Sequence, residues 1–440
     1  MPKSKAIIMK LWDKNEPIDK LFERFTIGKD KELDLELAYF DVLGTIGHVK
    51  MLHKISLLEE DDTKLLLAEL EEIKALAKDG KFVIEAGVED CHSQIELLLT
   101  RKLGDVGKKV HAGRSRNDQV LTALKLFTKH NLEEIITKVK SLFELLQEKS
   151  EANKDVLMPG YTHMQVAMPS SFGLWFGAYA ESLIDDLLLI KSAYQIADKN
   201  PLGSGAGYGS SFPLDREYST KELGFSTLNH NVVYAQMTRG KNERAASFAI
   251  SGLAATLSKF AMDVCLYAGQ DFEFLKLDTQ YTTGSSIMPH KHNPDGFELV
   301  RGKCNKLQSL SQELNMILTN LPSGYHRDLQ VLKESFMPAF QELKDCLDVT
   351  IAMTEKLEVD KDLINESKYD LLFTVEEVNR LVLDGVPFRD AYKQVAQLIQ
   401  SDEYKPDRGV DHTHIGSIGN LSNDKIKEAF EKEYSLFQME

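Results

Sequence analysis

The feature that most constrains the fold of this 440-residue chain is a set of long segments with helical periodicity. Residues 241–269 are the clearest case, because apolar side chains recur there in steps of three and four: Ile250, Leu253, Leu257, Phe260, Val264 and Tyr267. This spacing places them on one helix face, as a bundle requires. Lys259 and Asp263 argue against a membrane span. Because no run of alternating strands appears, the sequence predicts an all-α fold with a central bundle of long helices.

Helical patterns also occur on both sides of this segment. Residues 31–78 are rich in Leu, Glu, Lys and Ala and predict two or three amphipathic helices, interrupted at Gly44 and Gly47. Residues 85–104 contain a further helix, and the sequence from about residue 359 predicts a smaller helical unit. The chain is too long for one typical core, so two or three domains are expected.

The composition limits the partners of the chain. Its 68 acidic and 53 basic residues give a formal net charge of -15, which opposes binding to nucleic acid or an anionic membrane. Residues 1–12 contain a short apolar run without a cleavage site, so we expect a soluble, cytoplasmic protein. The four cysteines, at positions 91, 265, 304 and 346, are widely spaced, which predicts reduced core thiols and no zinc site.

The stretch TTGSSIMPHKHNPDGFELVRGK, residues 282–303, combines a loop with a helix start. Its glycine and serines predict a mobile loop that includes Ser285. Asn293 is a good N-cap and Pro294 suits the first helical position. A helix N-terminus beside Lys291 favours a bound anion such as a carboxylate.

The string HAGRSRNDQV, residues 111–120, precedes a long helix candidate. Ser115 and Asp118 have the spacing of a capping box. Arg114 and Arg116 flank this helix start and predict a bidentate carboxylate site, because guanidinium groups match carboxylate geometry.

Three more segments carry candidate site residues. Two prolines bound MPGYTHMQVAMPSS, residues 158–171, which predicts a loop where His163 can act as an acid or base near neutral pH. The glycine-rich residues 200–211 lack the spacing of a nucleotide-binding loop. Residues 321–334 carry Tyr325, Gln330 and Lys333 just after a Pro-Ser-Gly turn.

Several of these motifs together resemble the argininosuccinate lyase family of the fumarase/aspartase superfamily. GSSIMPHKHNPD resembles the signature loop of the superfamily, and HAGRSRNDQV is the most family-specific string. The EDxHS pattern at residues 89–93, GYTH, PLGSGA, the Tyr-Gln-Lys spacing near residue 330 and GVPFRDAY extend the resemblance from about residue 34 to residue 392.

This resemblance implies an architecture and an assembly. Three helical domains are expected, at residues 1–112, 113–360 and 361–440. It implies a homotetramer whose central helices form a common bundle, with composite active sites that each collect motifs from three subunits.

The resemblance also implies the reaction and its residues. The reaction is reversible cleavage of argininosuccinate into arginine and fumarate, with no cofactor and no metal, in arginine biosynthesis. Ser285 is the implied base, and His163 assists protonation of the leaving group or orients the acid. The implied substrate-binding residues are Ser115, Arg116, Asn117, Thr162, Lys291, Asn293, Tyr325, Gln330 and Lys333.

Some positions depart from the family pattern. His290 and His292 replace the usual Gln and Lys, and MPHK is commoner in adenylosuccinate lyases, which makes adenylosuccinate lyase or another fumarate-releasing lyase the nearest enzymatic alternative. Asp30 aligns with a serine that contacts substrate, and the acidic residues usual around Arg239 are replaced in QMTRGK. A crystallin-like structural protein of the same fold is the non-enzymatic alternative. The motifs do not distinguish a free from an N-acylated substrate.

Overall fold

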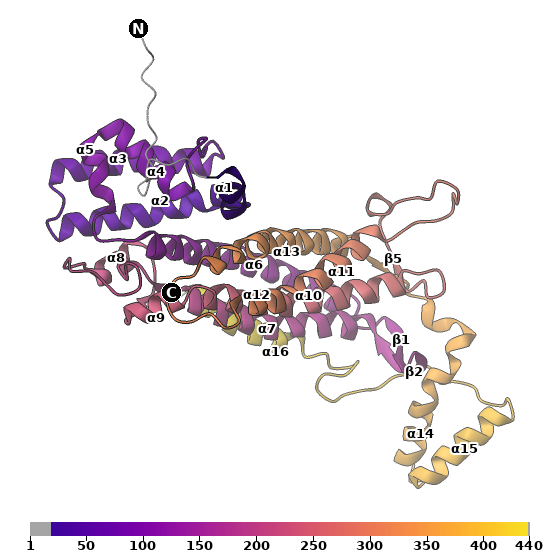
Figure 1. The fold of residues 1–440 in the computed structure, drawn as a ribbon. Helices are drawn as coiled ribbons and strands as arrows, with labels where there is room; N and C mark the ends of the chain where they lie inside the picture. Colours follow the sequence, from indigo (N-terminus) through magenta and orange to yellow (C-terminus); the bar gives the residue numbers. More distant parts are fainter. Residues whose placement is uncertain (1–18, 439–440) are drawn as a thin grey trace. The chain divides into compact units, whose positions relative to one another are not determined.

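The structure is a computed structural model that describes residues 19–438, so the apolar run at residues 1–12 lies outside the described residues. Helices dominate its secondary structure, and the strands are short (Figure 1). The predicted all-α fold is therefore confirmed.

The chain forms two compact units, each assembled from three separate stretches. Unit 1 comprises Met1–Glu134, Leu189–Ser251 and Ser309–Glu342, and unit 2 comprises Ile135–Leu188, Gly252–Gln308 and Leu343–Glu440. Four long helices contribute residues to both units: α6 (Arg116–Ala152), α7 (Phe172–Ala197), α10 (Lys241–Tyr267) and α13 (Leu332–Glu355). The division into three domains stays a prediction.

The other elements of unit 1 are further helices and one small parallel strand pair. The α-helices are α1 (Lys20–Ile27), α2 (Asp30–Lys54), α3 (Glu60–Lys78), α4 (Cys91–Leu103), α5 (Asp105–Lys108), α8 (Arg216–Glu222), α9 (Val232–Met237) and α12 (Leu310–Leu318). The 3-10 helices are η1 (Lys109–His111) and η3 (Arg327–Gln330), and the strands are β3 (Lys199–Asn200) and β4 (Thr227–Leu228).

The expected interruptions at Gly44 and Gly47 are wrong, because α2 continues through both. A Cβ on Gly47 would lie 2.7 Å from Leu223 Cδ2, and one on Gly44 would lie 3.5 Å from Thr122 Cγ2. Gly47 therefore allows Leu223 to approach α2 closely, whereas a Cβ on Gly44 would make only an ordinary van der Waals contact, and neither glycine ends the helix.

Unit 2 contains one β-hairpin and the C-terminal helices. The strands are β1 (Leu157–Thr162), β2 (Gln165–Ser171), β5 (Leu275–Lys276) and β6 (Glu358–Val359). The helices are α11 (Asp295–Gln308), α14 (Thr374–Leu383), α15 (Phe388–Gln400), α16 (Asn423–Gln438) and the 3-10 helices η2 (Thr279–Tyr281), η4 (Leu363–Asn365) and η5 (Ser367–Phe373). Helices α14, α15 and α16 agree with the helical pattern expected after residue 359, while a separate unit there stays a prediction.

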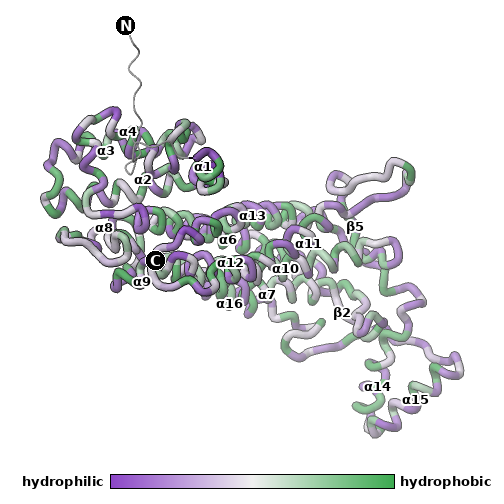
Figure 2. The backbone as a smooth tube through the Cα atoms, in the orientation of Figure 1, coloured by the Kyte–Doolittle hydropathy of each residue, from purple (hydrophilic) through white to green (hydrophobic). Residues whose placement is uncertain are grey.

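Aromatic side chains fill the core of each unit. In unit 1, the Phe127 ring on α6 lies 5.7 Å from Phe40 on α2 and 5.5 Å from Phe340 on α13. In unit 2, the Trp175 ring on α7 stacks on Phe260 of α10 at 5.5 Å. Figure 2 shows hydrophobic and hydrophilic stretches alternating along the long helices, as expected for helices with a buried face.

Helix α10 matches the segment with the clearest periodicity. It is long and apolar enough to cross a membrane by length and composition, but half of its most apolar window is buried inside the structure. Its Asp263 carboxylate accepts hydrogen bonds from Trp175 Nε1 at 3.1 Å and Tyr179 Oη at 2.7 Å, both on α7. These contacts are typical of a core helix in a helical protein.

Candidate active site

Unit 1 contains a polar cavity of about 250 Å³ lined by five of the predicted substrate-binding residues. These are Arg116, Asn117, Tyr325, Gln330 and Lys333. They come from the start of α6, from the segment around η3 and from the start of α13. The turn before α13 thus supplies cavity-lining residues, as the resemblance implies.

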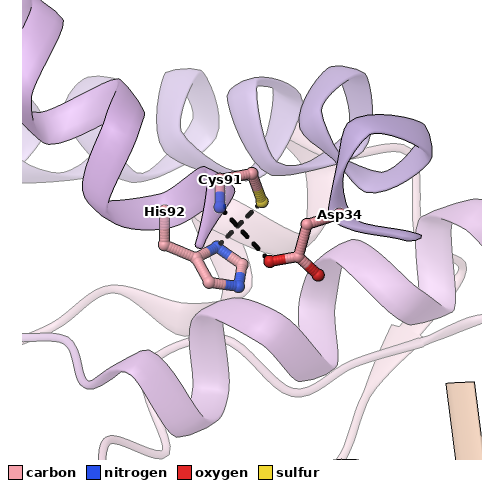
Figure 3. A group of neighbouring side chains, drawn as sticks. All are labelled: Asp34, Cys91 and His92. Atoms are coloured by element: carbon pink, nitrogen blue, oxygen red, sulfur yellow. Dashed lines mark hydrogen bonds between the residues drawn. The ribbon is translucent and has the colours of Figure 1, made fainter. Parts of the chain in front are cut away.

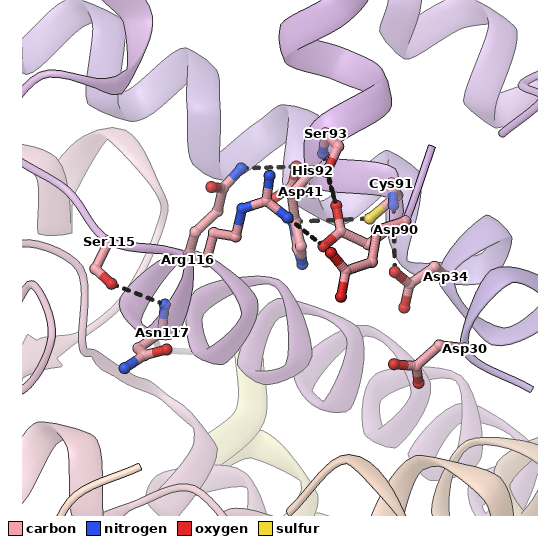
Figure 4. A network of polar contacts seen from close by, with 12 residues as sticks. Asp30, Asp34, Asp41, Asp90, Cys91, His92, Ser93, Ser115, Arg116 and Asn117 are labelled. Carbon is pink, nitrogen blue, oxygen red and sulfur yellow. Dashed lines mark hydrogen bonds and ion pairs between the residues drawn. The ribbon is translucent and has the colours of Figure 1, made fainter. Parts of the chain in front are cut away.

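Ion pairs arrange the charged groups of this cavity (Figure 4). Arg116 Nη1 donates to Asp90 Oδ2 at 2.6 Å. The Lys333 ammonium lies 2.7 Å from Asp30 Oδ1 and 2.8 Å from Asp34 Oδ1. Burial opposes a charged lysine, but the two carboxylates raise the pKa of Lys333 above its usual value.

The start of helix α4 borders this cavity, and its residues Asp90 and His92 line it. Asp90 is the N-cap, and its carboxylate accepts the Ser93 N–H at 2.7 Å, which leaves Oδ2 for Arg116. His92 Nδ1 lies 2.9 Å from Asp41 Oδ1. Burial opposes the charged imidazole, but the Asp41 carboxylate prevails and the pKa of His92 is raised.

Asp34, Cys91 and His92 lie close enough to hold a metal ion (Figure 3), since one ligand atom from each falls within 4.8 Å of the others. All three already have partners. Asp34 binds Lys333 and accepts the Cys91 N–H at 3.2 Å, while His92 pairs with Asp41. Burial raises the pKa of Cys91 well above its usual value, which favours the thiol over the metal-binding thiolate. We therefore interpret these three residues as part of a hydrogen-bond and ion-pair network within the protein and not as a metal site.

Ser115 contributes to the local structure of the α6 start and does not line the cavity. Its Oγ accepts the Asn117 N–H at 3.3 Å, while its own N–H donates to Asp118 Oδ1 at 2.9 Å. The predicted capping box is therefore confirmed only for the bond from the Ser115 N–H to Asp118, because the Ser115 hydroxyl accepts from Asn117 and not from Asp118. Of the two flanking arginines, only Arg116 lines the cavity, and Arg114 Nη1 donates to Thr45 Oγ1 at 2.9 Å.

Asp118 also holds the glycine-rich loop that follows α7. The backbone N–H groups of Gly203 and Gly205 donate to its Oδ2 at 2.9 and 2.8 Å. The side chain is fully buried, and this burial raises the pKa of Asp118 to about 6. The loop thus binds a carboxylate of the protein itself.

Asp118→Asn should lower the free energy of unfolding by about 1–3 kcal/mol, because the amide has one acceptor oxygen and its NH₂ group would face a backbone N–H. Denaturant midpoints measured against the surface variant Asp105→Asn would test this. Asp105 is 92% exposed and its pair with Lys108 should contribute little. Equal midpoints for the two variants would contradict a structural role for Asp118.

His163 and Thr162 lie at a hairpin and not in the loop expected from the flanking prolines. Strands β1 and β2 pair with Thr162 opposite Gln165, so His163 and Met164 form the two-residue turn. Their φ angles are 54° and 59°, as in a type I′ turn, where Asn-Gly is the usual sequence. A histidine in this conformation is uncommon and exposed, which supports a functional reason for its presence.

Ser285, Lys291 and Asn293 belong to one loop of unit 2 that is closed at its base. Asn293 donates its N–H to the Thr283 carbonyl at 2.8 Å and accepts the Thr283 N–H at 3.3 Å. Helix α11 begins at Asp295, so Pro294 precedes the helix and the predicted start was one residue early. Lys291 is exposed near this start.

Two backbone N–H groups of the same loop donate to the Ser285 hydroxyl. Its Oγ accepts the backbone N–H groups of Met288 at 3.1 Å and Ile287 at 3.3 Å. Hydrogen bonds to an anionic oxygen favour the anion, so this turn is suited to stabilising an alkoxide. The predicted residues thus fall in two groups, with Thr162, His163, Ser285, Lys291 and Asn293 in unit 2 and the remainder in unit 1.

Sequence reasoning missed Asp34 and Arg327 among the charged residues of the cavity. Asp34 follows Asp30 by four residues on α2, and this spacing places both on one helix face. Arg327 lies between Tyr325 and Gln330, and its Nη2 donates to Glu89 Oε1 at 3.3 Å. The acidic partner of Arg239 is Glu243, with Nε 2.8 Å from Oε1.

Comparison with known proteins agrees with these motifs. Residues 14–309 match the protein family described as Lyase. The argininosuccinate lyase of Parabacteroides distasonis is 60% identical over 417 residues, which cover 95% of this chain and 94% of that protein. This chain belongs to the argininosuccinate lyase family. The member from Bacteroides fragilis is 57% identical, and the match covers 98% of this chain and 96% of that protein. The member from Thermotoga neapolitana is 40% identical, and the match covers 88% of this chain and 98% of that protein.

Solved structures with low sequence identity share the fold of this family member. An EDDS lyase variant with bound fumarate has a TM-score of 0.74 at 20% identity and covers 94% of this chain and 90% of its own. Class II fumarase from Schistosoma mansoni has a TM-score of 0.72 at 16% identity, and the match covers 93% of this chain and 91% of the fumarase chain. The expected fumarase/aspartase-like fold is confirmed.

Proposed function

We propose that this enzyme cleaves argininosuccinate reversibly into arginine and fumarate. The observation that carries the proposal is the 57–60% identity to argininosuccinate lyases over nearly the whole chain. The comparisons favour this activity over adenylosuccinate lyase, although MPHK is commoner in adenylosuccinate lyases. The product arginine suggests a role in arginine biosynthesis in the cytoplasm.

The proposed chemistry is removal of a Cβ proton followed by loss of a guanidinium nitrogen. Ser285 takes the proton, the C–H electrons form the double bond of fumarate, and the C–N bond breaks toward the leaving guanidino group. The two backbone donors at Ser285 Oγ support its role as the base. His163 protonates the leaving nitrogen or orients the acid that does so.

Removal of the Cβ proton before the C–N bond breaks gives a carbanion intermediate, whose negative charge spreads onto the neighbouring substrate carboxylate. This charge must be stabilised where it develops. Lys291, Asn293 and the N-terminus of α11 are suited to this, because each offers positive charge or hydrogen-bond donors. The unit 1 cavity, with Arg116, Asn117, Tyr325, Gln330 and Lys333, binds the rest of the substrate. Ser115 supports the α6 start, and Thr162 contributes from the hairpin.

We also propose a homotetramer with composite active sites. Large apolar side chains remain exposed on the long helices, on α11 and on the hairpin, as expected of surfaces that another subunit covers. They include Leu188, Phe248, Met262, Leu299, Val349, Met164 and Val166. The proposal needs no cofactor, metal, membrane or nucleic acid.

Fumarate release monitored by ultraviolet absorbance tests the proposed activity. Argininosuccinate should give a kcat/KM at least about 100-fold above that for adenylosuccinate, because the two leaving groups require different binding contacts. Faster release from adenylosuccinate would support the alternative lyase. Release from neither substrate would support a crystallin-like protein.

A further inference from the structure

The cavity of unit 1 has one more carboxylate than the cations available to neutralise it. Four carboxylates line it, those of Asp30, Asp34, Glu89 and Asp90. Four Arg or Lys side chains and His92 also line it, but two of these five groups pair with carboxylates outside the lining, Arg239 with Glu243 and His92 with Asp41. Three cations, Arg116, Arg327 and Lys333, therefore remain for four carboxylates.

The extra negative charge lies at Asp30. Asp90 pairs with Arg116 and Glu89 pairs with Arg327, which leaves Asp30 and Asp34 to share Lys333. Asp34 is 1% exposed, and its second oxygen accepts the Cys91 N–H. The Asp30 side chain is 18% exposed, and its second oxygen has no hydrogen-bond partner among the described residues.

We propose that Asp30 determines specificity by binding a free primary ammonium on the amino-acid end of the substrate. This inference rests on the proposed function and deepens it. An ammonium would complete the neutralisation of the cavity and donate to the open Asp30 oxygen in a charge-assisted hydrogen bond. Burial raises the pKa of Asp30, so a bound cation would offset the cost of keeping this carboxylate ionised.

An N-acyl group on the substrate would remove both the neutralising charge and the charge-assisted hydrogen bond to Asp30. Acylation replaces the ammonium with a neutral amide that has a single N–H, and it adds bulk where Asp30 borders the cavity. The carboxylate would then keep its uncompensated charge while losing access to water. The enzyme should therefore select a free amine over its N-acyl derivative.

The test compares argininosuccinate with its Nα-acetyl derivative in the wild-type enzyme, Asp30→Asn and Asp30→Ser. The wild type should favour the free amine in kcat/KM by at least about 100-fold. Asp30→Asn keeps the side-chain shape but removes the charge, so this ratio should fall by about 10- to 100-fold, mainly through KM for the free amine. Asp30→Ser should also lower the ratio.

The control is Asp61→Asn, because Asp61 is an exposed acidic residue on α3 that does not line the cavity. It should leave the ratio unchanged. A ratio that Asp30→Asn also leaves unchanged would overturn the inference, as would equal cleavage of both substrates by the wild type. Tighter substrate binding by Asp30→Asn would instead mean that Asp30 competes with a substrate carboxylate for Lys333. A wild-type enzyme that cleaves neither substrate would reject the proposed function itself.

Discussion

Ser285→Ala should lower kcat by about 1000-fold or more while changing KM by less than about 3-fold, because in the proposed mechanism the hydroxyl acts in the transition state and contributes little to ground-state binding. The alanine keeps the backbone turn but removes the oxygen that accepts the Met288 and Ile287 N–H groups. Steady-state kinetics of fumarate release measure both constants.

The neighbouring residue Ser286 provides a matched control. Its side chain is exposed and has no assigned role, so Ser286→Ala should lower kcat far less than Ser285→Ala does. If Ser285→Ala retained more than about a tenth of wild-type activity, Ser285 could not be the base. Comparable losses in both variants would point to the loop conformation instead.

In the proposed homotetramer with composite sites, mixing the His163→Asn and Ser285→Ala variants should restore activity from near zero. His163→Asn should by itself lower kcat by about 100-fold through loss of the proposed acid–base group. Asparagine tolerates the left-handed backbone of this turn well, so the hairpin should persist. In a composite site, one subunit supplies the intact histidine and another supplies the intact serine.

Random reassembly of equal amounts should give up to about a quarter of sites in which neither contributing chain supplies its mutated residue. The experiment dissociates the two variants mildly, reassociates them together and measures fumarate release. Each variant treated alone is the control and should stay inactive. Absence of recovery in tetramers shown to be mixed would mean that one chain supplies both residues.

The sequence by itself determined the fold class, the position of α10, the start of α6 and the family. Helical periodicity is local, so α10 could be recognised from its own side chains, and the capping box at Ser115 depends only on residues three apart. The motifs also identified five residues that line one cavity, because each motif keeps its own residue types and spacing.

Only the tertiary structure decided how distant residues pair. The flanking prolines could not show that β1 and β2 form a hairpin, because strand pairing depends on contacts along both strands. Glycines 44 and 47 resembled helix breaks in the sequence, but α2 continues through both, and Gly47 allows Leu223, far along the chain, to pack closely against the helix. Lys333 forms ion pairs with Asp30 and Asp34, which lie about 300 residues earlier in the chain. A local sequence pattern could not predict the charge balance of the cavity, because that balance depends on which distant residues meet there.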